Sequence, residues 1–159
     1  MRAVLATIVA TCAVLATCAT GAATLAAANA SHVDNWATHG EKVVCGIAEK
    51  VWGTRVDPGT MAPLNGYWPG LQCAAAGIPR PRQGVGDPFV QLGQGQAGRA
   101  RLVDESQDDL VSSGRYVELA PGSSWSRDGI DCAVARSSVR CTNSAGHGFT
   151  LSPGHVHLF

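Results

Sequence analysis

The six cysteines of this 159-residue chain fall into two groups. Cys12 and Cys18 lie in an N-terminal Ala/Thr/Val/Leu run that carries no charge after Arg2, and the other four lie beyond it. That run ends in Ala28-Asn29-Ala30, which is typical of a signal peptide followed by a signal-peptidase site. We therefore predict that residues 1–30 are removed after Ala30, and that residues 31–159 form a single disulfide-stabilised β domain. Its first residues, 31–41, are expected to be a flexible N-terminal segment.

Two other readings of the N-terminus stay open. The uncharged run is long enough to span a bilayer as an uncleaved anchor, although its low Leu, Ile and Phe content makes a weak span. Leu15-Ala16-Thr17-Cys18 also resembles a lipobox, but Thr17 stands where Gly, Ala or Ser normally precedes the lipidated cysteine. We favour cleavage, and so expect no permanent membrane span and a secreted, extracellular or cell-envelope location.

The mature domain keeps an even number of cysteines, which in an exported chain indicates a disulfide framework. Sequence separation favours a Cys132–Cys141 bridge, which leaves Cys45–Cys73 as the other. Zinc is the competing use of four cysteines. It is disfavoured because no two of them have the close spacing of a zinc knuckle.

Alternating polarity in the last third of the chain predicts antiparallel strands. If residues 136–137 form a turn, strands at 130–134 and 139–141 place Cys132 opposite Cys141, within the distance that a disulfide needs. A second hairpin about Pro153-Gly154 pairs Phe149 with Leu158 and Leu151 with Val156. Apolar residues then share one face of the last hairpin, and polar residues share the other.

The remaining chain is less regular. Strands are predicted at 42–47, 88–92, 99–103 and 115–119, a long Pro/Gly loop at 53–69 and one helical turn at 73–76. Short strands at intervals of about 8–12 residues with turn signals between them indicate an all-β fold. We therefore predict a small antiparallel sandwich or partly open barrel with long loops and two disulfides.

Charge and motifs argue against several classes of function. The chain has a formal net charge of zero and no basic block, whereas nucleic-acid binding needs a positive surface. Residues 93–98 match G-x-G-x-x-G, but the following residues resemble a strand and not the helix that a nucleotide site requires. We predict a mobile hairpin loop there, with no nucleotide and no other cofactor. A cluster of acidic residues is predicted to be a solvated turn, and not a glycosidase or calcium site: Asp104, Glu105, Asp108 and Asp109.

Histidines give a weak signal for metal binding. His155 and His157 would share one face of a strand, and His147 could be a third ligand, but two ligands do not make a site. We expect His155 and His157 to face solvent and the ring of His147 to bond to backbone. Common nucleophile and metalloprotease motifs are absent from the sequence, so an enzyme is disfavoured but not excluded.

Tryptophan is the residue that most favours recognition. Four Trp fall within the mature domain, and aromatic residues are preferred at recognition surfaces. Trp125 adjoins a predicted hairpin and is assigned to the core. Trp36, Tyr67 and Trp68 lie in irregular segments and could be exposed. Tyr67 and Trp68 are therefore the candidate binding residues.

Part of the sequence resembles a known family. The residues are Trp125 with Gly129-Ile130-x-Cys132, then Val139-x-Cys141-x-Asn143, then the motif Gly146-His147-Gly148-Phe149, and the ending Leu158-Phe159. They are similar to small exported actinobacterial proteins of mycobacterial type and unknown function, over about 35–40 residues. A weaker likeness covers residues 44–47, 55–57 and 68–69.

The resemblance also bears on the disulfides and on location. Relatives often carry a Cys where Val56 stands and another near Val103, and loss of both fits a pairing between them, which leaves Cys45–Cys73 here. The resemblance implies an exported or envelope protein and supplies no activity. Our interpretation is a non-enzymatic binding module for an unknown envelope or extracellular ligand, using the loop that carries Trp68. The alternatives are a secreted hydrolase and a histidine-based metal-binding protein.

Overall fold

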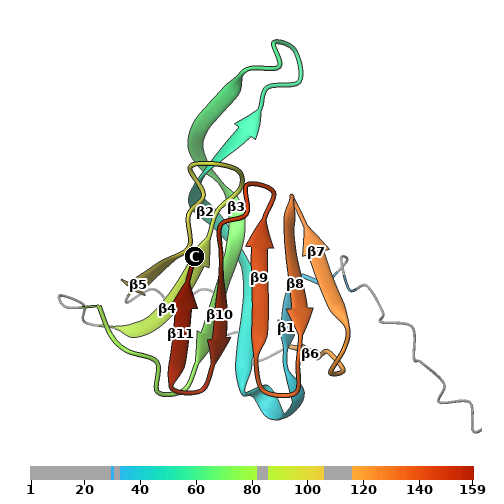
Figure 1. Cartoon of the computed structure of the whole chain (residues 1–159), viewed down its shortest axis with the longest axis vertical. Helices are drawn as coiled ribbons and strands as arrows, with labels where there is room; N and C mark the ends of the chain where they lie inside the picture. The colour runs from blue at the N-terminus through green and yellow to red at the C-terminus, as the bar shows by residue number, and fades with distance from the viewer. Residues whose placement is uncertain (1–29, 31–32, 82–85, 106–115) are drawn as a thin grey trace, which may run out of the picture.

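The described residues of a computed structural model (30, 33–81, 86–105 and 116–159) form two β-sheets that face each other (Figure 1). The first sheet has the order β5-β4-β3-β2-β1-β6, and all neighbours are antiparallel except β1 and β6. Its strands are β1 (Asn35–Ala37), β2 (Val43–Val56), β3 (Pro63–Ala75), β4 (Asp87–Leu92), β5 (Arg101–Glu105) and β6 (Val117–Glu118). A short 3₁₀ helix, η1 (His39–Glu41), joins β1 to β2.

The second sheet is an antiparallel meander of five consecutive strands. Its strands are β7 (Ser124–Arg127), β8 (Ile130–Val134), β9 (Val139–Asn143), β10 (Gly148–Ser152) and β11 (His155–Leu158). The chain therefore completes the first sheet before it begins the second. This ordering places residues 119–123 as the connection between the sheets.

The two sheets bury matching rows of side chains against each other. In the first sheet the row is Trp36–Cys45–Cys73–Val90, and in the second it is Trp125–Cys132–Cys141–Phe149, each set by strand register. Residues of both rows belong to one hydrophobic core. The rings of Trp36 and Trp125 meet across the sandwich, with centroids 5.9 Å apart. Both disulfides lie within these rows and join directly opposed cysteines, at Cα–Cα distances of 4.1 Å.

These findings confirm the predicted fold class. The protein is all-β, its two sheets do not close into a barrel, and its bridges are Cys45–Cys73 and Cys132–Cys141. The predicted register of the last hairpin is also confirmed, since Phe149 pairs with Leu158 and Leu151 with Val156. His155 and His157 are exposed, as the alternation predicted.

Three local predictions differ from the structure. Residues 53–69 are not a loop, because β2 and β3 continue through them as a paired hairpin. Residues 73–75 belong to β3, so the helical turn is wrong. Alanine favours helix, but pairing with β2 and the disulfide at Cys73 fix this segment as strand.

The expected flexible segment 31–41 also contains regular structure. Residues 35–37 form β1 between β2 and β6, and Trp36 is fully buried. Trp36 is therefore a core residue. Residues 1–29, which include most of the predicted signal peptide, lie outside the described residues.

Candidate functional site

The most distinctive surface feature is the distal part of the β2–β3 hairpin, which projects beyond both sheets (Figure 1). We call residues 51–68 the arm. A register shift between Ala48 and Val51 separates the arm from the part of the hairpin that lies in the sheet. The tip at 57–62 is closed by Asp57, whose carboxylate accepts hydrogen bonds from the backbone N–H groups of Gly59 and Thr60, both at 2.8 Å. These bonds hold the pKa of Asp57 below its ordinary value, with the Thr60 bond the larger cause.

One face of the arm carries an exposed aromatic pair. Trp52 and Tyr67 are directly paired, their ring centroids are 5.3 Å apart, and they meet edge to face. The two side chains are 41% and 63% exposed. The next pair on this face is Thr54 and Asn65, whose side chains are joined by a hydrogen bond of 2.6 Å from the hydroxyl to the amide oxygen. We call this surface the aromatic face.

The opposite face of the arm packs against the body of the protein. Trp68 lies here, because it pairs with Val51 and alternates with Tyr67 along β3. It is half-buried, and the guanidinium carbon of Arg55 lies 5.3 Å from its ring centroid. Arg55 also donates to the side chain of Gln94 at 2.8 Å and to that of Asp128, in the turn between β7 and β8, at 3.5 Å. The two candidate binding residues therefore lie on opposite faces, and only Tyr67 is on the exposed one.

The glycine-rich loop 93–98 supports the arm. It joins antiparallel β4 to β5 with no helix after it, which confirms the hairpin loop, whereas the predicted mobility of this loop stays a prediction. Its Gln94 carbonyl accepts the backbone N–H of Thr54 at 2.7 Å, and the Ala97 N–H donates to the Thr54 hydroxyl at 2.9 Å. A Cβ at Gly53 would lie 2.7 Å from the backbone nitrogen of Gln94, so only glycine permits this approach.

Asn143 fastens the loop to the second sheet. Its amide nitrogen faces three carbonyl oxygens of the loop, those of Gly93, Gly95 and Gly98, at 3.0, 2.8 and 3.0 Å. Its amide oxygen accepts the backbone N–H groups of Ala145 and His147 at 3.0 and 3.1 Å. One buried side chain thus links β9 to the loop under the arm. The glycines of the G-x-G-x-x-G pattern serve this backbone packing.

The histidines do not form a common site. His155 and His157 are exposed on the outer face of β11, whereas His147 precedes β10 and is half-buried. The ring Nε2 of His147 is buried and has no hydrogen-bond partner among the described residues, so the bond to backbone that the sequence predicted is not found at this nitrogen. No group of three His, Cys, Asp or Glu side chains within the described part of the chain is placed to hold a metal ion.

The acidic cluster is described only in part. Asp104 lies on β5, and its carboxylate accepts the backbone N–H of Gly86 at 2.6 Å. Asp108 and Asp109 fall outside the described residues, so the predicted turn is not tested there. In the described part of the cluster, the Asp104 carboxylate therefore makes a structural contact with the backbone of Gly86.

Sequence reasoning missed Trp52 as a site residue. The signal was present, because residues 51–56 and 63–68 can pair about the Asp57-Pro58-Gly59 turn and bring Trp52 opposite Tyr67. The density of glycine and proline obscured it.

Comparison with known proteins adds no identity. No protein-family model, curated protein or solved structure matches this chain. Among the helices of the described residues, none has the length and apolar character needed to cross a membrane.

Proposed function

We propose that this chain is a secreted or cell-envelope binding protein without catalytic activity, and that the aromatic face of the arm is its contact surface. The observation that carries the proposal is where apolar side chains are exposed. Among the described residues, seven large apolar side chains are exposed, and five of them lie on the arm. They are Trp52, Val56, Met61, Leu64 and Tyr67.

A concentration of this kind favours recognition. Scattered exposed apolar residues are ordinary, whereas their concentration on one projecting element is unusual and favours an interaction site. Trp52, Tyr67 and Val56 share the aromatic face by register, and Leu64 lies on the opposite face, beside Arg55. Trp and Tyr provide large contact areas at low cost in side-chain entropy, and the edge-to-face contact already orients both rings. The packed face of the arm, fixed by Arg55 and the 93–98 loop, presents the aromatic face in one orientation.

Export is supported by the disulfides and by the N-terminal sequence. Disulfides form and persist in oxidising compartments. Both bridges lie in the buried core. Ala30 donates its N–H to the Ser124 carbonyl at 3.0 Å, a bond that a mature chain beginning at Ser31 lacks. N-terminal sequencing of the exported protein should give Ser31 as the first residue. A start upstream of Ala30 would contradict the proposed cleavage site, and a full-length membrane-bound form would contradict cleavage itself.

Site-specific photocrosslinking in the producing cells tests the contact surface. A photoreactive phenylalanine analogue replaces Tyr67, and, as a control, Asp131, which is exposed on the outer face of the second sheet. We expect discrete adducts from the arm position only, and their loss when Trp52→Ala is added. Removal of a central aromatic contact costs about 2 kcal/mol, or about thirtyfold in affinity. Equal adducts from both positions, or adducts that survive Trp52→Ala, would overturn the proposal.

A further inference from the structure

A groove lies on the outer side of the first sheet. It is formed by other strand positions than the arm, around the paired residues Val44 and Ala74. The volume of the groove is about 680 Å³, which is within the usual range for small-molecule sites. Its floor includes Val44 and Ala74, which are paired across β2 and β3. Both alternate with core residues, so their side chains point away from the sandwich interior. We call this surface the outer-face groove.

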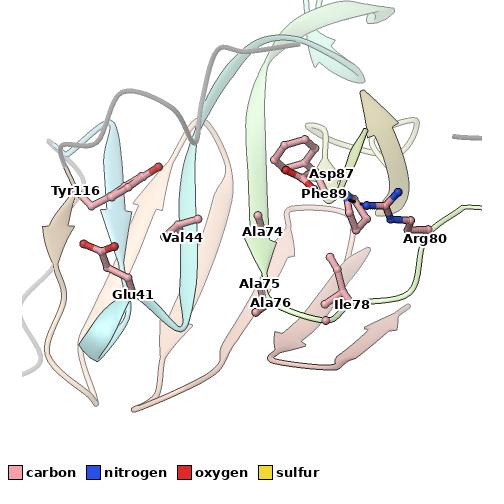
Figure 2. A pocket seen from close by; sticks show the side chains of 12 residues that line it. Glu41, Val44, Ala74, Ala75, Ala76, Ile78, Arg80, Asp87, Phe89 and Tyr116 are labelled. Carbon is pink, nitrogen blue, oxygen red and sulfur yellow. Dashed lines mark ion pairs between the residues drawn. The ribbon is translucent and has the colours of Figure 1, made fainter. Parts of the chain in front are cut away.

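The floor of the outer-face groove is apolar and shallow. Phe89 of β4 continues the floor beyond Ala74, and Ile78 closes one side (Figure 2). Adjacent strands are about 4.8 Å apart, so Val44, Ala74 and Phe89 extend over about 10 Å across the sheet. Small side chains in the middle leave room for a slender or flat apolar group.

Charge is distributed unequally between the two ends. Arg80 and Asp87 lie together at one end, with the guanidinium 3.9 Å from the carboxylate, so they largely compensate each other. Glu41 lies at the other end beside Tyr116 (Figure 2). No ion pair joins Glu41 to any residue that the structure describes. Two acids and one base line the groove, and the excess negative charge lies at the Glu41 end.

The environment of Glu41 reinforces this asymmetry. Burial, and to a smaller extent the negative charge of Glu41, raise the pKa of Tyr116. The phenol therefore remains neutral at physiological pH. Glu41 also has a backbone φ of 53°, in the left-handed region that side chains with a Cβ rarely adopt. Such unfavourable conformations are often retained at functional sites.

We propose that the outer-face groove binds a small amphipathic cation, with its apolar body on the Val44–Ala74–Phe89 floor and an ammonium or amidinium group beside Glu41. The negative charge of Glu41 favours a cationic head group, and the apolar floor favours an apolar body. The inference does not depend on the arm, because none of its residues (51–68) lines the groove.

Calorimetric titration of the mature protein tests the inference with simple probes. Octyltrimethylammonium, used below its micellar concentration, has a cationic head and an apolar chain of about the floor's length. Octyl sulfate offers the same chain with an anionic head. We expect saturable one-to-one binding of the cation and much weaker binding of the anion. Absence of saturable cation binding, or equal binding of both probes, would overturn the inference.

Two variants with matched controls locate the bound probe. Ala74→Leu fills the floor and should weaken cation binding at least tenfold, whereas Ala133→Leu, on the exposed outer face of β8, should not. Glu41→Gln should weaken it about threefold to fivefold, as for a solvent-exposed ion pair, whereas Glu49→Gln should not. Nuclear magnetic resonance shifts of the Val44 and Ala74 methyl groups on titration give a second readout on the unaltered protein. Unchanged methyl shifts, or affinities insensitive to both groove variants, would refute the site.

Discussion

Asn143 is a single side chain on which two parts of the fold depend, and its replacement has a predictable cost. Asn143→Ala removes two donated and two accepted hydrogen bonds from a residue that is 5% exposed. The amide has only two hydrogens, so the three loop carbonyls share them. A net value of about 0.75–1 kcal/mol for each of the four bonds, near the middle of the usual range, gives a loss of about 3–4 kcal/mol. For a domain of this size that corresponds to a fall in Tm of about 12–16 °C.

Asn143→Asp gives a sharper test, because it keeps the shape and the accepting oxygen. The new oxygen faces three carbonyl oxygens in place of a donor, so the charged form of the introduced carboxyl is disfavoured and its pKa is raised. The protonated acid donates a hydrogen bond and restores one contact. The deficit in stability should therefore be largest at neutral pH and should shrink as the pH falls through the raised pKa.

Chemical denaturation and thermal melts between pH 4 and 8 measure both effects. Asn65→Asp is the matched control, since Asn65 is exposed on the arm and its oxygen still accepts from Thr54 after the change. We expect a change of at most about 0.5 kcal/mol there. Asn143 variants that melt within about 2 °C of the parent, a shift of about 0.5 kcal/mol, would refute this role of Asn143.

Three further predictions follow from described contacts. Phe149→Ala should destabilise the protein by about 3–5 kcal/mol in thermal melts, because the Phe149 side chain is fully buried, whereas His157→Ala should change stability by less than about 0.5 kcal/mol, because His157 is exposed. Similar losses from both would reverse the assigned faces of the last hairpin. Double Cys→Ala replacement of the bridge in the first sheet, which has the larger sequence separation, should lower the denaturation free energy by about 1 kcal/mol more than replacement of the bridge in the second, from the loop lengths alone; equal losses would contradict that entropy argument. The pKa of Glu118 is lowered mainly by its hydrogen bond with His39, so this bond contributes to the stability of β6 above the ordinary carboxylate pKa, and the contribution is lost as the pH falls through the lowered pKa. Hydrogen exchange at the Leu119 amide, which is bonded to Ala37, should therefore accelerate at low pH, and Glu118→Gln should abolish this pH dependence.

The second sheet could be predicted from sequence because its information is local. Each strand from 130 onward alternates in polarity, each turn carries a suitable residue, and consecutive strands pair. Register then follows from keeping the apolar residues on one face. The disulfides follow from the same register.

The first sheet and the arm could not be predicted in the same way. On the packed face of the arm, Gly53 lies against the backbone of Gln94 and not against apolar side chains. The usual alternation of apolar and polar residues is therefore missing there. Trp36 is buried because β1 lies inside the first sheet, between β2 and β6, and because its ring packs against Trp125 of the second sheet. Such long-range contacts leave no local pattern. The sequence consequently predicted that Tyr67 is exposed, as it is, but placed it in the wrong local structure.

The placement of the two disulfides divides the covalent structure of the molecule. Each bridge joins strands that are consecutive in the chain and lie in the same sheet, so no cross-link connects one sheet to the other. Only the backbone at residues 119–123 ties them covalently, and the interface itself is held by non-covalent contacts such as Trp36 against Trp125. A protease that cuts in this connection would leave two internally bridged halves. After such a cut the halves would be held together by non-covalent contacts alone, among them the shared hydrophobic core.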